Sequence, residues 1–336
     1  MTPPTLLRPV DPREVRFFSG SSNRPLARAI AEWLDIPLTP THISRFSNDN
    51  LYVQLGGSCR GRVVFVMQSL SPPVNDHLME LLMMLDAARG AAAREVHAVI
   101  PYFSFARSDK KDAPRISITA RLVADLLVTS GATHVMTMML HSPQVHGFFS
   151  LPTDPLTARA VLANHFRNED LEGAIVVAPD MGSAKSAARF ADNLGVPVAA
   201  GNKERVADNR VVISSLVGHQ VEGFRRAIIF DDEIATGSSV IELARLLQQR
   251  GISCVDVAST HGVFVKGALN RLHSESVIRN IIVTDTVERA ADSAHPRLRV
   301  LSVAPVFGEA IQHNWHRQSI GTLFDYGQEL EDSPAG

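Results

Sequence analysis

The sequence predicts an α/β protein, because short apolar runs alternate with amphipathic helical patterns along most of the chain. Such apolar runs are typical of strands buried in a parallel sheet. The alternation pauses at Leu151–Leu156, a segment with two prolines, and then restarts. Because 336 residues are too many for one compact α/β core, we expect two domains, residues 1–155 and 156–336, each a mostly parallel sheet flanked by helices.

In the first domain, apolar runs predict strands, and segments with apolar residues at three- and four-residue spacing predict helices. The predicted strands are Val15–Ser19, Val63–Gln68, Val96–Pro101 and Thr133–Met139. The predicted helices are Pro25–Leu34, Asp76–Arg89 and Ser117–Thr129. We expect Leu151–Leu156 to be a connector, because its prolines interrupt the pattern.

The same rhythm runs through the second domain. The predicted strands are Ala174–Ala178, Val196–Ala200, Ala227–Asp231, Cys254–Ser259, Ile281–Thr284 and Val300–Val303. The predicted helices are Ser183–Asn193, Ser238–Gln249 and Val263–Leu272. The closing segment, Val306–Phe324, predicts a helix followed by a tail.

The composition argues against several classes of protein. The formal net charge is −2 and no cluster of lysine and arginine stands out, so we expect no nucleic-acid partner. Cys59 and Cys254 lie far apart without CxxC spacing, which argues against disulfides and thiolate zinc sites and favours a reducing compartment. The N-terminal residues lack a secretory apolar core, and no apolar run reaches membrane-spanning length. We therefore expect a cytoplasmic protein without a membrane partner.

The segment Arg226–Val240, RAIIFDDEIATGSSV, is the most informative part of the chain. An apolar strand leads into Asp231 and Asp232, whose carboxylates can accept hydrogen bonds from vicinal hydroxyls. A turn of small residues follows and opens a helix, where backbone N–H groups and hydroxyls can bind a phosphate: Ala235, Thr236, Gly237, Ser238 and Ser239. Together they describe a site for a sugar phosphate, most simply ribose 5-phosphate. The alternative is an acidic strand end followed by an ordinary helix N-cap.

Polar residues also follow other predicted strands. Arg107, Lys110, Lys111 and Arg115 can hold a polyphosphate, although such a charged run is also typical of a solvated loop. His141 follows the next strand end, where ligands bind in α/β proteins, although a lone histidine is more often structural.

The second domain offers two further candidates. Asp180 ends its first strand as His141 ends a strand of the first domain, and the two can share a Mg²⁺ ion that also binds substrate phosphates. Lys203 and Arg205 alternate within the polar segment Gly201–Val211. They predict an arm that neutralises charge on a transferring phosphoryl group, and the alternative is a solvated hairpin. The sequence contains neither a P-loop motif nor a convincing dinucleotide-binding motif.

At this point the chain resembles a known family, the ribose-phosphate diphosphokinases, also called phosphoribosyl pyrophosphate (PRPP) synthetases. The resemblance covers nearly the whole chain and depends on blocks that occur in order: Arg45–Asn50, Asn75–Arg89, Ala98–Lys111, Ile118–Leu127, Leu140–Phe149, Val176–Gly182 and Ile228–Ser239. The last block alone is shared with the wider type I phosphoribosyltransferases, whereas the ordered set is highly specific.

The resemblance implies two tandem phosphoribosyltransferase-like domains in a homo-oligomer, a dimer or a hexamer built from dimers. It implies Mg²⁺-dependent transfer of the diphosphoryl group of ATP to the C1 hydroxyl of ribose 5-phosphate, which gives PRPP and AMP. Asp231 and Asp232 would face the ribose, and the turn 235–239 would hold its phosphate. Lys203, Arg205 and His141 would be catalytic, with His141 and Asp180 at the metal. ATP would be bound by Phe46, Asn48, Asn50, Arg107, Ser108 and Asp109.

The chain also departs from the family pattern. Typical members have Phe-Ser-Asp-Gly-Glu where this chain has residues 46–50, Phe-Ser-Asn-Asp-Asn, so the nucleotide donor is left open. They have Arg-Gln-Asp at residues 107–109, an acid at Met139 and Asp-Thr-Gly-Gly-Thr at residues 235–239. Besides an active diphosphokinase, three alternatives stay open: a non-catalytic binding relative, a phosphoribosyltransferase that uses PRPP, and the same chemistry with another nucleotide donor or another pentose phosphate.

Overall fold

The computed structural model describes residues 8–207, 210–288 and 295–323, which form two compact units. The first contains the described residues up to Thr157, together with 286–288 and 303–323. The second contains the described residues of 158–285 and 295–302. Whereas the sequence boundary gives everything after residue 155 to one domain, the contacts assign the last helix to the first unit.

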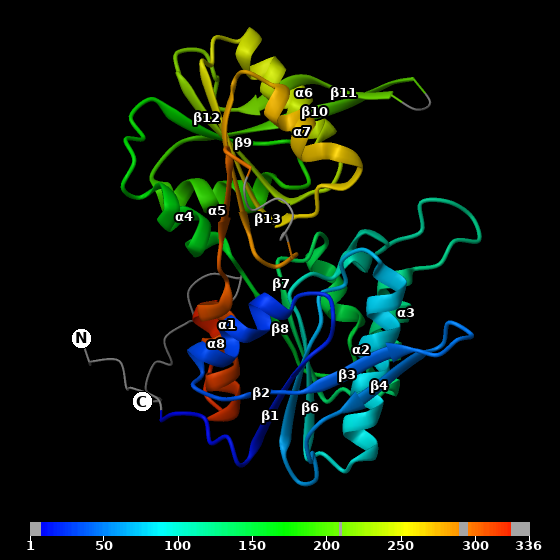
Figure 1. Cartoon of the computed structure of the whole chain (residues 1–336). Helices are drawn as coiled ribbons and strands as arrows, with labels where there is room; N and C mark the ends of the chain where they lie inside the picture. The colour runs from blue at the N-terminus through cyan, green and yellow to red at the C-terminus, as the bar shows by residue number, and fades with distance from the viewer. Residues whose placement is uncertain (1–7, 208–209, 289–294, 324–336) are drawn as a thin grey trace, which may run out of the picture. The chain divides into compact units, whose positions relative to one another are not determined.

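The first unit is built on a six-stranded parallel sheet with the strand order β2-β1-β5-β6-β7-β8. The strands are β1 (Val15–Ser19), β2 (Leu38–Thr39), β5 (Val63–Met67), β6 (Glu95–Ile100), β7 (His134–Met138) and β8 (Thr153–Leu156). Figure 1 shows helices on both faces, namely α1 (Arg24–Trp33) and α8 (Ala304–Trp315) on one and α2 (Val74–Gly90) and α3 (Thr119–Thr129) on the other.

Helix α8 belongs to the first unit because it packs against α1. Gly308 of α8 lies directly against the indole of Trp33, and a larger residue at that position would collide with the ring. The predicted tail contains only a short 3-10 turn, Gly321–Leu323, within the described residues, and Phe324 lies outside them.

The prediction that Leu151–Leu156 is a connector was wrong. Residues Thr153–Leu156 form β8, which pairs in parallel with β7 and places Thr137 opposite Pro155. A proline is tolerated here because β8 is an edge strand, where one side of the backbone has no ladder partner and the missing N–H costs nothing.

The first unit also carries an antiparallel hairpin of β3 (Thr41–Arg45) and β4 (Leu51–Leu55), which the sequence pattern did not predict. The hairpin forms a separate two-stranded sheet. Its strand residues are half-buried or exposed, and none of them is fully buried. It therefore lacks the continuous apolar run by which the buried strands were recognised.

The second unit is built on a seven-stranded sheet with the order β11-β10-β9-β12-β13-β14-β15, parallel except for the β10–β11 pair. The strands are β9 (Ala174–Ala178), β10 (Val198–Ala207), β11 (Arg210–Gly218), β12 (Arg226–Ile234), β13 (Cys254–Gly262), β14 (Ile278–Thr284) and β15 (Leu298–Leu301). The helices are α4 (Arg159–Phe166), α5 (Ala184–Leu194), α6 (Ser238–Gln249) and α7 (Ala268–Ser274).

Both sheets confirm the predicted fold class, and every predicted strand is present with small shifts of its ends. Strand β12 continues to Ile234, so Asp231, predicted as the last strand residue, and Asp232 both lie within it. The helix predicted at Val263–Leu272 starts later, after a short 3-10 turn at Val265–Gly267. Among the described residues, no helix has the length and apolar character needed to cross a membrane.

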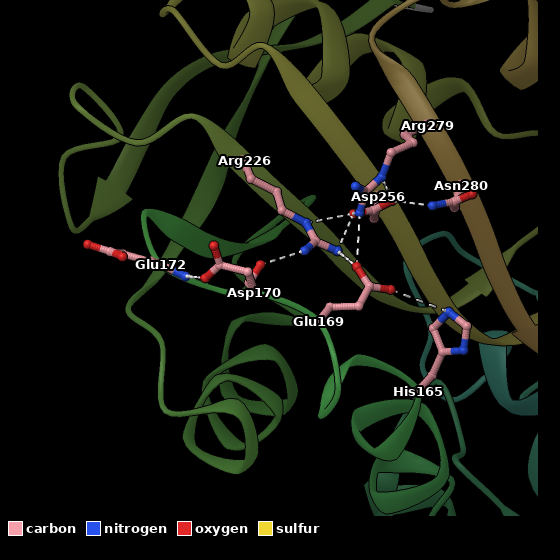
Figure 2. Close-up of polar contacts among 8 residues, drawn as sticks. All are labelled: His165, Glu169, Asp170, Glu172, Arg226, Asp256, Arg279 and Asn280. Atoms are coloured by element: carbon pink, nitrogen blue, oxygen red, sulfur yellow. Dashed lines mark hydrogen bonds and ion pairs between the residues drawn. The ribbon is translucent and has the colours of Figure 1, made fainter.

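The amino ends of β12, β13 and β14 are joined by a network of charged side chains (Figure 2). Asp256 is fully buried and binds two guanidinium groups, with Arg226 Nε at 2.8 Å and Arg279 Nη2 at 2.7 Å. The amide of Asn280 donates a third hydrogen bond at 3.0 Å, and Glu169 accepts from Arg226 at 2.6 Å. This network stabilises the sheet at the edge opposite the candidate site.

Candidate active site

The second unit places an acidic pair at the carboxyl end of its central strand. Asp231 and Asp232 are both partly buried, and the backbone N–H of Asp232 donates a hydrogen bond to Asp231 Oδ1 at 3.0 Å. Burial raises the pKa of Asp231 well above its ordinary value, and the charges of Asp232 and Asp180 raise it further. The site thus concentrates negative charge that a diol, a proton or a cation can relieve.

A tight turn follows the acidic pair and opens α6. Gly237 has a φ of +75°, in the left-handed region that glycine adopts readily. It is the N-cap residue of α6, which begins at Ser238. The side chains of Thr236 and Ser238 are exposed, and their hydroxyl oxygens lie 3.3 Å apart. Hydroxyls beside the positive end of a twelve-residue helix are suited to a phosphate.

Asp180 lies just after β9, the strand that pairs with β12. Its carboxylate accepts hydrogen bonds from the backbone N–H of Ser183 at 3.2 Å and from the Ser183 hydroxyl at 3.4 Å. The negative charge of Asp180 also contributes to the raised pKa of Asp231, after burial and the neighbouring Asp232.

These carboxylates fit a Mg²⁺ ion. Carboxylate oxygens are ligands that Mg²⁺ prefers, and the mutual repulsion at Asp231 is what a nearby divalent cation would relieve. In the part of the chain that the structure describes, three or more histidine, cysteine or acidic side chains are nowhere gathered as a complete metal site. Mg²⁺ does not require such a cage, because it commonly keeps water ligands and binds substrate phosphates.

Lys203 and Arg205 lie on β10, in the antiparallel β10–β11 hairpin. Lys203 pairs with Ile213 and Arg205 with Val211, and the ladder shifts register just before Lys203 and just after Arg205. The segment that the sequence predicts as an arm is therefore a strand pair, and its role on a substrate stays a prediction.

In the first unit, the residues that follow β6 and β7 come together. Arg107 ends a short 3-10 helix, Ser104–Arg107, and is exposed. The backbone of Ser108 accepts from the N–H of Ala120 at 3.1 Å, which ties this segment to the start of α3. Asp109 accepts a hydrogen bond from the side-chain amide of Gln144 at 2.7 Å, across to the segment that contains His141.

His141 is exposed and follows a strained position. Met139, just after β7, has a φ of +45°, which is unusual for a residue with a side chain. Its N–H is held by the carbonyl of Leu156 on β8 at 3.0 Å. The edge strand that was not predicted thus fixes the backbone that leads to His141, and strain of this kind is often found at functional sites.

Phe46, Asn48 and Asn50 lie at the tip of the β3–β4 hairpin, where all three are exposed. The N–H of Phe46 bonds the carbonyl of Asn50 at 2.9 Å, and this closes the turn. Arg45 forms ion pairs at 2.9 Å with Asp49 in the turn and with Asp76 of α2. The structure thus bonds Asp109 to Gln144, in the segment that follows His141, whereas residues 46–50 form the tip of a hairpin that projects from the unit (Figure 1).

Sequence reasoning did not single out two residues that support these segments. Gln144 connects the predicted ATP segment to the His141 segment, and Arg271 of α7 donates to the carbonyl of Thr236 at 2.6 Å. Gln144 lies in the block Leu140–Phe149, which carries the family resemblance, so the sequence did offer a signal for it. The sequence offered no such signal for Arg271, because its acceptor lies 35 residues earlier in the chain.

Comparisons with known proteins agree with this description. Residues 15–131 match the family model described as the N-terminal domain of ribose phosphate pyrophosphokinase, and residues 212–325 match the phosphoribosyl synthetase-associated domain. A Streptomyces coelicolor relative is 53% identical over 313 residues, which is 93% of this chain and 98% of the relative. A Deinococcus radiodurans protein named ribose-phosphate pyrophosphokinase is 46% identical over 312 residues, 91% of this chain and 97% of that protein.

A solved structure shows the same fold. The crystal structure of phosphoribosylpyrophosphate synthetase from Mycobacterium smegmatis is similar to this chain with a TM-score of 0.84 and 36% identity. The match covers 90% of this chain and 99% of that one. The phosphoribosyltransferase-like fold expected from the sequence is therefore confirmed, and the chain belongs to the ribose-phosphate pyrophosphokinase family of enzymes.

Proposed function

We propose that this enzyme transfers the diphosphoryl group of ATP to the C1 hydroxyl of ribose 5-phosphate, in a Mg²⁺-dependent reaction that gives PRPP and AMP. The observation that carries the proposal is the succession of Asp231, Asp232, the left-handed turn at Gly237 and the N-terminus of α6. One segment thereby offers carboxylates for hydroxyls and amides for a phosphate, which are the two groups of a ribose phosphate.

The second unit would bind the acceptor. Asp231 and Asp232 would accept hydrogen bonds from the ribose hydroxyls, and the 5-phosphate would lie on the turn residues Ala235, Thr236, Gly237, Ser238 and Ser239. The two exposed hydroxyls in that turn supply donors in addition to the backbone. Ala235 and Ser238, which differ from the usual family residues, leave the backbone donors intact.

The first unit would bind the donor, with Phe46, Asn48 and Asn50 at the adenine and Arg107, Ser108 and Asp109 at the phosphates. The oxygen of the C1 hydroxyl attacks the β-phosphorus of ATP, and the hydroxyl proton is released to water. The bond from that phosphorus to the oxygen shared with the α-phosphate breaks, and AMP leaves. Phosphoryl transfer of this kind depends mainly on alignment and on stabilising the charge of the transition state.

Lys203 and Arg205 would stabilise the transferring group through their positive charges, together with His141. Asp180 and His141 would hold Mg²⁺, which neutralises phosphate charge when bound. We further infer a homo-oligomer, a dimer or a hexamer built from dimers. A cytoplasmic location stays a prediction from the cysteine content.

The test incubates the purified protein with ribose 5-phosphate, ATP and MgCl₂, with and without inorganic phosphate, and measures AMP and PRPP by ³¹P NMR. Lys203→Ala is the control, and equal amounts of AMP from both proteins would refute the catalytic assignment. GTP, CTP and ADP are compared with ATP, because Asn48 and Asn50 replace the usual acids. If ribose 5-phosphate binds but no AMP forms with any donor, the protein is a non-catalytic binding relative. Light scattering of the protein as it elutes from a size-exclusion column gives the oligomeric state.

A further inference from the structure

The turn that follows β12 is held from one side by the segment that follows β13. The backbone N–H groups of Val263 and Phe264 both donate to the carbonyl of Ile234, at 3.0 and 2.9 Å. The N–H of Val265 donates to the carbonyl of Ala235 at 3.0 Å. Two successive carbonyls at the start of the turn are therefore already fixed by the backbone of the neighbouring segment.

Arg271 extends this pattern to the next carbonyl. Its Nη2 donates to the carbonyl oxygen of Thr236 at 2.6 Å, and its Nη1 donates to the carbonyl of Lys266. The guanidinium thus bridges the turn and the segment that precedes α7. Beside it, the buried side chain of Leu272 lies against Gly237, where even a single added methyl group would be in tight contact at 3.3 Å.

The direction of these carbonyls decides where the amides point. In a planar trans peptide, the N–H of a residue points opposite to the preceding carbonyl. Because the carbonyls of Ile234, Ala235 and Thr236 all face the β13–α7 segment, the N–H groups that follow them are directed away from it. Amides directed in this way are available to an anion at the α6 N-terminus.

The supporting segment is itself held in a strained conformation. Phe264 and Lys266 have φ values of +45° and +54°, which residues with side chains rarely adopt, and Gly267 follows at +70°. Such a conformation persists only where the surrounding contacts enforce it, and it is often associated with preorganised sites. The bond from Arg271 to Lys266 is one of the contacts that enforce it.

We propose that Arg271 is a positioning residue for the phosphate-binding turn. It acts through the carbonyl of Thr236 and keeps the amides of the turn oriented for the 5-phosphate of ribose 5-phosphate, so it rests on the proposed function above. A planar guanidinium is suited to bridging two carbonyls, and a lysine ammonium does not reproduce its fork of donors. The role depends on hydrogen-bond geometry rather than on charge alone.

The test uses Arg271→Met, which removes the donors, and Arg271→Lys, which keeps the charge. Arg250→Met is the matched control, because Arg250 is another exposed arginine of the second unit and pairs with Glu222 at 2.9 Å. Isothermal titration calorimetry gives the Kd of each full-length protein for ribose 5-phosphate and for ATP. Steady-state assays give the two KM values and kcat, and circular dichroism checks that each variant is folded.

We expect both Arg271 variants to weaken ribose 5-phosphate binding by about tenfold, as loss of a hydrogen bond from a charged donor does. The Kd for ATP and kcat at saturation are expected to stay near wild type, as is every value of Arg250→Met. Wild-type affinity in Arg271→Met overturns the assignment. Wild-type affinity in Arg271→Lys alone also overturns it, because charge would then be sufficient. If the unmodified protein binds no ribose 5-phosphate, the proposed function itself is refuted.

Discussion

The side-chain amide of Gln144 donates a hydrogen bond of 2.7 Å to the carboxylate of Asp109. The bond joins the segment that follows β6 to the segment that follows β7, so one contact links the neighbourhood of Arg107 to that of His141. Burial alone would raise the pKa of Asp109, but hydrogen bonds from Ser142 and Gln144 outweigh it and lower the pKa. The carboxylate is therefore held in its charged form by its neighbours.

Replacing Gln144 with leucine is expected to weaken ATP binding. Leucine has a similar size but no donor, so the segment 107–109 loses its tie to the His141 segment. We expect KM for ATP to rise about fivefold, which corresponds to one hydrogen bond of about 1 kcal/mol, with KM for ribose 5-phosphate unchanged. Steady-state kinetics with each substrate varied in turn measures both constants, and Gln249→Leu on the exposed end of α6 is the control. An equal rise in both constants would contradict the link.

Asp231→Asn is expected to stabilise the free protein while it weakens ribose 5-phosphate binding. Because the folded pKa of Asp231 is raised, its protonated form contributes stability below the unfolded pKa of about 3.9. That contribution is lost as the pH rises through the raised folded pKa. The melting temperature of the asparagine variant should therefore exceed that of wild type increasingly as the pH rises. This is a trade-off between stability and function.

Differential scanning fluorimetry at a series of pH values from 4 to 8 measures the effect. Asp192→Asn, at an exposed position of α5, is the matched control and should leave the pH profile unchanged. A melting temperature of Asp231→Asn that falls below wild type at pH 8 would show that the carboxylate is stabilising in the free protein. Burial and the neighbouring negative charges would then not explain the effect of Asp231 on stability.

Most of the fold could be predicted because its central strands are buried on both faces. Every residue of β5 is buried and apolar, so the strand reads as one continuous run. Strand β8 could not be predicted in the same way, since only pairing with β7 makes a strand of a segment with prolines. The β3–β4 hairpin is half exposed, so its strands do not read as a continuous apolar run either.

The candidate site also has a part that could be predicted from the sequence and a part that could not. Asp231, Asp232 and the turn at Gly237 are contiguous, so their chemistry could be predicted from one short segment. The supports of that segment could not. Arg271 reaches Thr236 from 35 residues away, and its acceptor is a backbone carbonyl, a group that every residue carries. Such contacts leave no pattern in residue types and become visible only once the chain is folded.

Removing the carboxylate of Asp256 is expected to destabilise the second unit strongly. Asp256 has no exposed surface and binds Arg226, Arg279 and Asn280, so Asp256→Ala leaves the buried guanidinium of Arg226 with fewer partners (Figure 2). Breaking a buried pair in this way costs about 3 kcal/mol of unfolding free energy or more. Urea unfolding measures the loss, and Glu222→Gln, which breaks an exposed pair with Arg250, is the comparison and should change little. Equal small losses would mean that solvent reaches the network.

His146 is expected to make the first unit sensitive to acid. It is partly buried, with Nε2 3.3 Å from the hydroxyl of the buried Thr137, and burial lowers its pKa from 6.5 to about 4. The unfolded chain therefore binds a proton that the folded chain does not bind between these two values. Stability that is present above about pH 6.5 should be lost progressively as the pH falls toward 4.

The variant His146→Gln cannot take up that proton, so its unfolding free energy should fall less over the same pH range. Chemical denaturation at pH 7.5, 6, 5 and 4.5 measures the slopes, with His219→Gln at an exposed position as the control. Parallel slopes for wild type and His146→Gln would show that other groups cause the acid sensitivity.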